Sequence, residues 1–218
     1  MATVEKSPVR LPVSLFVLHN VPWDVYEDLR AIDANRHVRM NYDHGSLQLM
    51  APSARHEDYA RLIERMIHAI VEELEIPIRS LGSTTWKRRA ESAGLEADDC
   101  YFILHAAGVA GRDANDLQRE ESPDLAVEVE ITSNSETKLP IYAALGVGEL
   151  WRFDGSTLRS WQLGADGQYV QAEQSLNLPF LRPADLEPFL ESNHDDETRW
   201  IKGFRRWVRE QFGDILDE

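Results

Sequence analysis

The sequence DLAVEVEI, at residues 124–131, decides the fold, because a large apolar side chain stands at every second position and only Ala126 interrupts the acids between them. A period of two predicts a β-strand whose apolar side faces a core. That side consists of Leu125, Val127, Val129 and Ile131. The other side carries the acids Asp124, Glu128 and Glu130. An acidic strand face is more often solvated than functional, so the pattern alone leaves both interpretations open.

The segments around this strand predict an α/β protein. Apolar residues recur at helical spacing over residues 55–75, and residues 138–145 predict a second helix that ends at Gly146. Further helices are expected at 22–33 and around 200–212. Strands are expected at 36–42, 46–50, 78–88 (one bent strand or two short ones), 100–104, 149–153, 158–163 and 169–172, and a polar loop runs up to Glu121.

Length and composition indicate one domain. The chain has 218 residues, of which 43% are hydrophobic, enough for a sizeable core. We expect that core at about 53–163, with an N-terminal extension (1–52) and a C-terminal extension (164–218). No segment approaches the roughly 20 apolar residues of a membrane span. The single Cys100 excludes an internal disulfide and fits a cytoplasmic protein.

The charge pattern restricts where a nucleic acid can bind. A formal net charge of -15 opposes non-specific attraction to phosphate, so DNA contacts must be local. The three consecutive bases Lys87, Arg88 and Arg89 are a candidate for such a contact, although a solvated strand end is at least as probable on pattern alone. Acids gather instead at residues 91–130, where Asp98 enters one strand and Glu128 lies on the next. Neighbouring carboxylates are what Mg²⁺ prefers, and Lys138 follows at a helix start.

An ordered series of motifs supports a resemblance to a known family. The series comprises Asp43-His44-Gly45, Met50-Ala51-Pro52, His56, Glu96-Ala97-Asp98, PDLAVEVEI at 123–131, Lys138, Tyr142 and GVGELW at 146–151. In this order the motifs resemble the Uma-two-type restriction endonuclease family, which belongs to the PD-(D/E)XK nuclease superfamily. The resemblance covers residues 22–163.

The resemblance implies a restriction endonuclease-like core, a mixed central sheet flanked by helices, here with an N-terminal helix and hairpin and a C-terminal hairpin and helix. It also implies metal-dependent hydrolysis of DNA, with Asp98 and Glu128 as ligands of Mg²⁺ or Mn²⁺. Glu130 stands where the superfamily usually has a Lys that assists the attacking water. Either Glu130 itself or Lys138 can take that role, and we rank Lys138 slightly ahead. His56 is expected to reach the site as a supporting or substrate-facing group, or to pack at the sheet edge.

Two other classes of function stay open at this point. The chain can be a catalytically silent member that keeps the fold as a binding or assembly module, because the usual Lys is missing. Its acidic surface can also bind a basic partner protein. The resemblance also implies a homodimer, which would suit the cutting of two strands, with the apolar face of the 200–212 helix as a candidate interface.

Overall fold

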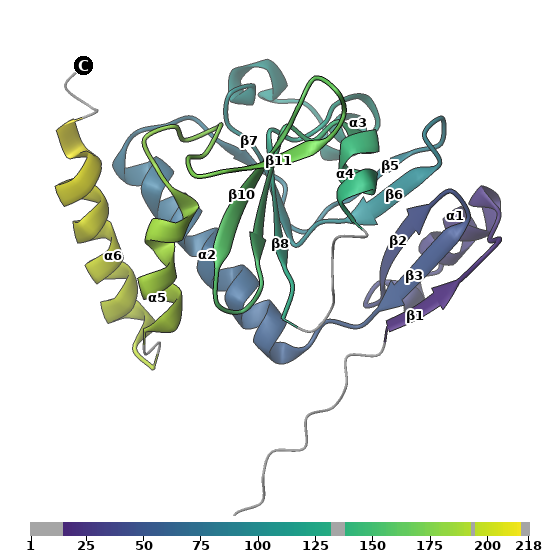
Figure 1. Ribbon diagram of the computed structural model, residues 1–218, viewed down its shortest axis with the longest axis horizontal. Helices are drawn as coiled ribbons and strands as arrows, with labels where there is room; N and C mark the ends of the chain where they lie inside the picture. The colour runs from purple at the N-terminus through teal and green to yellow at the C-terminus, as the bar shows by residue number, and fades with distance from the viewer. Residues whose placement is uncertain (1–14, 132–137, 193–194, 215–218) are drawn as a thin grey trace, which may run out of the picture.

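The computed structural model describes residues 15–131, 138–192 and 195–214, which form two β-sheets with helices around them (Figure 1). Sheet A is antiparallel throughout and has five strands in the order β1-β3-β2-β6-β5. Its strands are β1 (Leu15–Leu18), β2 (Arg39–Asp43), β3 (Ser46–Met50), β5 (Thr85–Arg88) and β6 (Ala93–Glu96). The edge strand β1 is exposed along its whole length.

Sheet B has six strands in the order β11-β10-β9-β8-β7-β4. Its strands are β4 (Arg79–Ser80), β7 (Asp99–Phe102), β8 (Leu125–Val129), β9 (Glu149–Phe153), β10 (Leu158–Leu163) and β11 (Tyr169–Ala172). The central pair β8–β9 is parallel and the other pairs are antiparallel, so the sheet is mixed.

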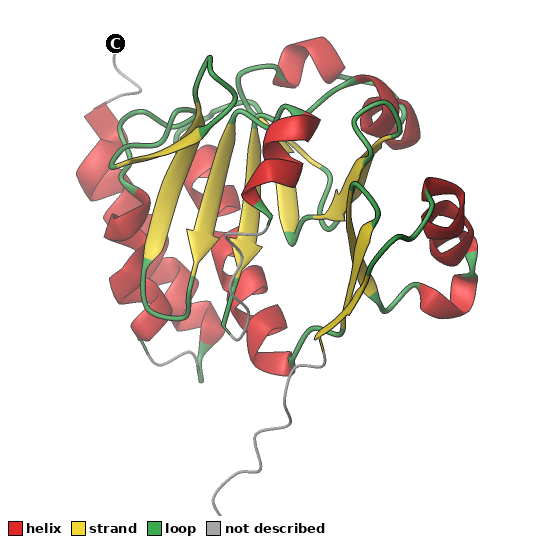
Figure 2. Cartoon of the chain, turned by 45° about the vertical axis from the view of Figure 1, so that its right-hand side comes forward, coloured by secondary structure: helices red, strands yellow, loops and turns green. Residues whose placement is uncertain are grey.

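Helices lie on both faces of sheet B, whereas the first helix packs on sheet A (Figure 2). The described residues contain six helices. They are α1 (Trp23–Ala31), α2 (Ala54–Glu73), α3 (Ala114–Glu120), α4 (Leu139–Leu145), α5 (Glu187–Glu191) and α6 (Glu197–Phe212), with short 3-10 turns at Asp33–Asn35, Ala106–Val109 and Pro183–Leu186. The long helix α2 packs under one face, with α5 and α6 outside it, and α4 lies on the opposite face.

Local sequence explains where α2 begins and where α4 begins and ends. Ser53 caps α2, because its hydroxyl accepts a hydrogen bond from the His56 N–H at 3.2 Å. Pro140 lies in the first turn of α4, where its missing N–H costs nothing. Gly146 ends α4 in the left-handed region, with φ at 75°. The short α4 therefore links the parallel strands β8 and β9.

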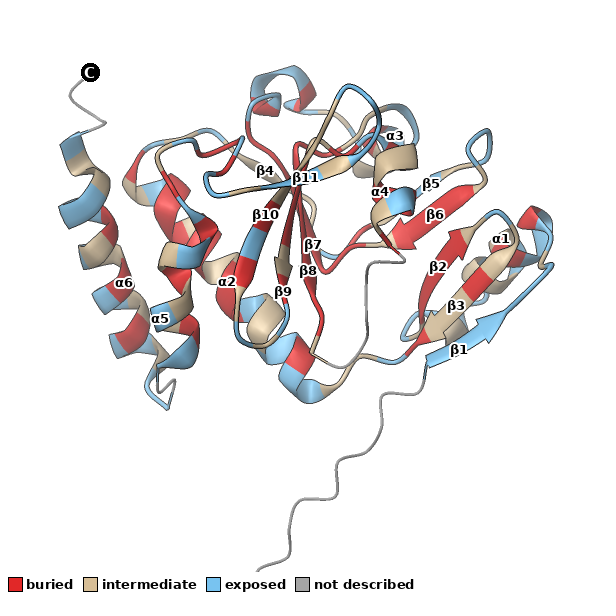
Figure 3. Ribbon diagram, viewed as in Figure 1, coloured by how far each residue is buried: buried red, intermediate tan, exposed pale blue. Residues whose placement is uncertain are grey.

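Strand β8 is buried on both faces (Figure 3). Leu125, Val127 and Val129 pack against α2, as the alternation predicts. Ala126 on the other side packs under α4, and Glu128 and Glu130 are only 1% and 9% exposed. A solvated acidic face is therefore wrong for this strand, because alternation shows which residues share a side but not whether a helix covers it.

The predicted α/β architecture is confirmed, including the mixed sheet, the N-terminal helix and hairpin, and the C-terminal hairpin and helix. Residues 78–88 form the two short strands β4 and β5. The predicted polar loop is partly wrong, because Asp113 caps the helix α3 within it. Strands β1 and β6 are additions to the predicted set.

The C-terminal helix α6 uses its apolar face inside the protein. Trp200, Phe204 and Val208 are buried in the core that α2 and sheet B share. That face is therefore not available as the subunit interface that the sequence suggested. Within the described ranges, no helix is long and apolar enough to cross a membrane.

A buried carboxylate ties the segment after β11 to sheet B. Glu149 on β9 is fully buried, and its Oε1 accepts hydrogen bonds from Trp151 and Ser160 at 2.9 and 2.6 Å. Its Oε2 accepts from the Ser175 hydroxyl at 3.0 Å and from the backbone and side chain of Asn177 at 3.0 and 2.8 Å. Residues beyond β11 therefore complete the core.

Candidate active site

A row of charged residues crosses sheet B on the face that α4 covers. Glu128 is the register partner of Arg152 on β9, and Arg152 is the partner of Arg159 on β10. Asp99 pairs with Val127, so one residue further along these antiparallel strands Asp98 comes opposite Glu128. The Asp98 N–H donates to the Val127 carbonyl at 3.1 Å, which fixes this position. We call Asp98, Glu128, Arg152 and Arg159 the charged row.

Asp98 lies in the turn between β6 and β7, and its side chain is only 2% exposed. Its Oδ1 forms an ion pair with Arg39 at 2.7 Å, and its Oδ2 lies 3.1 Å from His56 Nε2. Oδ2 also accepts a hydrogen bond from the Val129 N–H at 2.7 Å. Burial alone would raise the pKa of Asp98, but His56 and Arg39 hold it below its ordinary value. The carboxylate therefore stays ionised.

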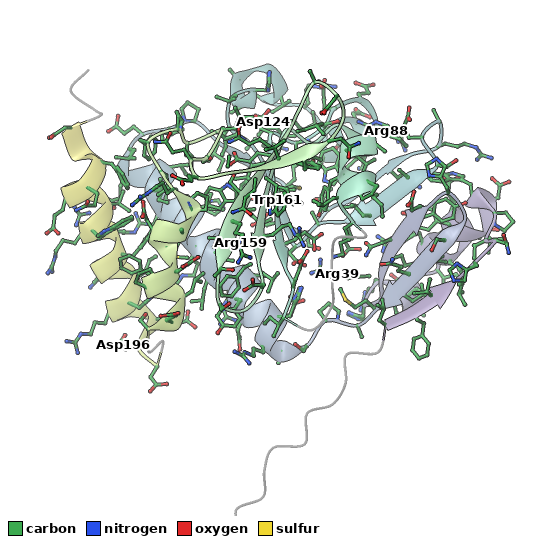
Figure 4. The ribbon with its side chains drawn as sticks, in the orientation of Figure 1. Arg39, Arg88, Asp124, Arg159, Trp161 and Asp196 are labelled. Atoms are coloured by element: carbon green, nitrogen blue, oxygen red, sulfur yellow. The ribbon has the colours of Figure 1, made fainter. Side chains whose placement is uncertain are left out.

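His56 and Arg39 bring two distant elements to Asp98. His56 lies in the first turn of α2, and Arg39 begins β2 of sheet A. Burial would lower the pKa of His56, but Asp98 raises it above its ordinary value. Arg39 also donates to the Ala97 carbonyl at 3.1 Å, and Figure 4 shows it between the two sheets. Sequence reasoning found His56 but not Arg39, whose strand lies far away along the chain.

Two side chains from the start and the middle of α4 contact the Glu128 carboxylate. Lys138 directly precedes that helix, and its Nζ lies 2.5 Å from Glu128 Oε2. Tyr142 donates its hydroxyl to Oε1. Burial would lower the pKa of Lys138, but the carboxylates of Glu128 and Asp98 raise it above its ordinary value. A charged ammonium group therefore lies within the carboxylate cluster.

Glu130 contacts a different cation. Arg152 donates to both oxygens of Glu130, from Nε at 3.3 Å and from an η nitrogen at 2.9 Å. The Arg152 guanidinium also lies 5.3 Å from the centre of the Trp161 ring. Of the two residues predicted to assist the attacking water, Lys138 thus contacts Glu128, and Glu130 contacts Arg152. Arg152 was not among the predicted residues.

The basic cluster Lys87–Arg89 lies away from the charged row, at the end of β5 in sheet A. Lys87 pairs with Glu27 of α1 at 2.8 Å, and Arg89 pairs with Asp24 at 2.7 Å. Arg88 donates to the Gln118 carbonyl in α3 at 2.9 Å. DNA contact by this cluster stays a prediction.

Asp124 lies at the other end of β8 and supports a turn. Its Oδ2 accepts from the backbone N–H groups of Ile103 and His105 at 2.7 and 2.9 Å. Its Oδ1 lies 2.5 Å from His105 Nδ1. The three acids on one side of β8 therefore have separate partners. Glu128 belongs to the charged row and Glu130 lies beside it, whereas Asp124 lies at the other end of the strand.

A cavity of about 320 Å³ opens beside Asp98. It is lined by Arg39, Glu57, Ala60, Arg61, Glu64, Gly82, Ser83, Asp98 and Asp99. Burial raises the pKa of Asp99 to about 7, although Tyr101 donates a hydrogen bond to its carboxylate. Glu64 reaches this cavity from α2, where its position at the border of the apolar stripe is the sequence signal that places it near the site.

The carboxylates of Asp98 and Glu128 suit a hard divalent cation, but two side chains do not supply all of its ligands. Carboxylate oxygens suit Mg²⁺, which proteins usually hold through one or two carboxylates together with water and substrate phosphate. Across residues 15–131, 138–192 and 195–214, no group of three or more His, Cys, Asp or Glu side chains is arranged to hold a metal ion. Asp98 and Glu128 can therefore hold such a cation only together with oxygens from water or substrate.

Most of the chain matches one family model. A family model described as "Putative restriction endonuclease", Uma2, matches residues 23–194. Among solved structures, the chain is similar to an Anabaena variabilis protein described as "a putative nuclease belonging to DUF820". The sequence identity is 16% and the TM-score 0.44, and the match covers 78% of this chain and 90% of the other. No curated protein matches the sequence.

Proposed function

Since this chain belongs to the Uma2 family, we propose that it is a metal-dependent endonuclease that hydrolyses phosphodiester bonds of DNA. The observation that supports the proposal most is the pair of adjacent buried carboxylates, Asp98 and Glu128, with the Lys138 ammonium group 2.5 Å from Glu128. Carboxylates beside a lysine can organise a cation, a water molecule and a phosphate in one place.

We assign Asp98 and Glu128 as the residues that hold Mg²⁺ or Mn²⁺. When bound, such a cation polarises the phosphate and lowers the pKa of a water molecule. His56 and Arg39 keep Asp98 ionised and fix its orientation, since they contact different oxygens of the same carboxylate. They act on the reaction through Asp98.

Lys138 is the stronger candidate for assisting the attacking water. Its ammonium group can orient a water molecule beside Glu128 and offset negative charge on the phosphate. Glu130 is the weaker candidate, because both of its oxygens accept hydrogen bonds from Arg152. Lys87, Arg88 and Arg89 are proposed to contact the DNA backbone, which requires Lys87 and Arg89 to exchange Glu27 and Asp24 for phosphate. A cytoplasmic homodimer is part of the same proposal, because two copies suit the cutting of two strands.

A silent binding module is the second candidate, and the pairing of the acids favours it. Asp98, Glu128 and Glu130 each contact a cationic side chain of the protein itself. The carboxylates therefore do not need a metal ion to offset their mutual repulsion.

Cleavage of supercoiled plasmid and of single-stranded DNA in Mg²⁺ and in Mn²⁺ tests the proposal. We expect nicking by wild type and no nicking by Asp98→Ala or Glu128→Ala, with Glu210→Gln on the exposed side of α6 as the matched control. Lys138→Ala against Glu130→Ala then identifies the assisting group. Equal background in wild type and both site variants, with a melting temperature unchanged by millimolar metal, would favour the silent module.

A further inference from the structure

Two arginines lie directly opposite each other across β9 and β10. Arg152 and Arg159 are register partners on antiparallel strands, so their side chains leave the same face of sheet B. Like charges in this position destabilise a sheet. Acids offset the repulsion on each side, with Glu130 on Arg152 and Asp154 on Arg159 at 2.9 Å.

The two arginines differ in how far their side chains are exposed. Arg152 is 13% exposed and lies between the Glu130 carboxylate and the Trp161 ring. Arg159 is 42% exposed and reaches solvent beside it. Figure 4 shows Arg159 and Trp161 together on β10. This face therefore carries one half-buried guanidinium, held by Glu130 and Trp161, next to one that solvent reaches.

The position of Arg152 and Arg159 in the charged row suggests that they bind a ligand. Arg152 is the register neighbour of Glu128, and Arg159 follows one strand further out. Moving outward from Asp98, the row therefore changes from two acids to two bases. Planar guanidinium groups bind phosphate through paired hydrogen bonds, which suits them to a nucleic-acid backbone.

We propose that Arg152 and Arg159 bind successive backbone phosphates of a DNA strand, so that this strand lies across β9 and β10 on the same face of sheet B as α4. This inference rests on the proposed function, because it names where that substrate lies. Arg152 holds the phosphate nearest Glu128, and Arg159 holds the next one. Trp161 and Glu130 keep the Arg152 guanidinium in place between substrates.

Binding of a fluorescein-labelled oligonucleotide, measured by anisotropy, tests the inference without metal or cleavage. Single-stranded and duplex DNA are titrated in EDTA with a Glu128→Gln background. We expect Arg152→Gln and Arg159→Gln each to weaken binding by about tenfold, as for loss of a charged hydrogen bond. The slope of log affinity against log salt should fall by about one for each arginine removed.

Matched variants keep the test sharp. Arg205→Gln removes an arginine that also pairs with acids, Glu72 and Glu73, but lies on α6 away from the row, so its affinity should match the background. Arg152→Lys should keep the salt dependence of binding, because the charge stays, but lose part of the affinity, because an ammonium group cannot form paired hydrogen bonds. Circular dichroism melting checks that each variant is folded. Equal affinities of the Arg152→Gln, Arg159→Gln and Arg205→Gln variants, or no binding by the background protein, would overturn the inference.

The outcomes separate this inference from the proposed function. Plasmid cleavage by wild type, with oligonucleotide affinity unaffected by either arginine, overturns the strand path and leaves the nuclease proposal in place. Arginine-dependent binding without cleavage of any DNA supports the strand path and overturns hydrolysis as the function.

Discussion

The cluster Lys87–Arg89 and the arginine pair Arg152 and Arg159 are both basic, but the chain builds them in different ways. The first is contiguous in sequence, lies at the end of β5, and pairs with acids of α1. The second comes from two strands and joins a row that begins with buried carboxylates. A run of charges in a sequence therefore marks a local surface, whereas strand register brings charges together into a possible site.

Burial is the physical difference between these regions. Lys87 and Glu27 are 43% and 36% exposed, while Lys138 and Glu128 are 8% and 1% exposed. Water and salt weaken an exposed ion pair, but a buried pair depends on each partner to offset the cost of desolvation. Removing one partner should therefore have very different effects in the two places.

The largest expected effect follows from breaking the buried pair. Glu128→Ala leaves the Lys138 ammonium group buried beside Asp98, and we expect a loss of about 3–5 kcal/mol in the free energy of unfolding. Glu27→Ala should lose less than about 1 kcal/mol. Urea denaturation at neutral pH measures both variants. Similar losses would show that the two regions do not differ in the way the burial indicates.

A smaller effect concerns Asp99, which adjoins the row and has a pKa raised to about 7 by burial. A raised pKa means that the folded protein binds this proton more tightly than the unfolded chain. Stability should therefore fall as pH rises from the ordinary aspartate range to about 7. Asp99→Asn cannot lose this proton, so its free energy of unfolding should fall less than that of wild type between acidic and mildly alkaline pH. We expect the two falls to differ by about 2–4 kcal/mol. A difference that does not change with pH would contradict the assignment.

The smallest expected effect concerns the exposed ion pair between Glu27 and Lys87. Glu27→Gln frees Lys87 from its ion pair, so the affinity for DNA should rise by about two- to fivefold if the cluster contacts the backbone, with a stability change below about 1 kcal/mol. Lys87→Ala should then lower the affinity. Anisotropy at low salt measures both. If neither variant changes the affinity, the cluster does not contact DNA, and Arg152 and Arg159 are the basic residues to test.

Sequence patterns predicted the elements that carry the acids, because β8 has a large apolar residue at every second position and α2 has one apolar stripe. They also identified Asp98, Glu128 and Lys138, which the structure brings together. Arg39 and Arg152 were missed for one reason. Arg152 reaches Glu128 through the pairing of β8 with β9, and Arg39 reaches Asp98 from the other sheet. A local sequence pattern predicts neither the register between strands nor the contact between sheets.

The burial of Glu128 and Glu130 was missed for a related reason. Alternation along β8 is equally compatible with water or with a helix on the acidic side, and α4 supplies that helix only because the crossover between parallel strands folds back over the sheet. Covered strand faces follow from topology, which the short apolar run of α4 does not reveal by itself.

The buried Glu149 carboxylate sets an order for folding during synthesis. Strand β9 leaves the ribosome well before Ser175 and Asn177, whose hydrogen bonds the carboxylate needs. Until those residues emerge, closing sheet B around Glu149 would leave its buried Oε2 without hydrogen-bond donors, although Trp151 and Ser160 already satisfy Oε1. We therefore expect sheet B to close around Glu149 only after residues 175–177 have been synthesised, and a chain that ends before Ser175 to lack part of its core.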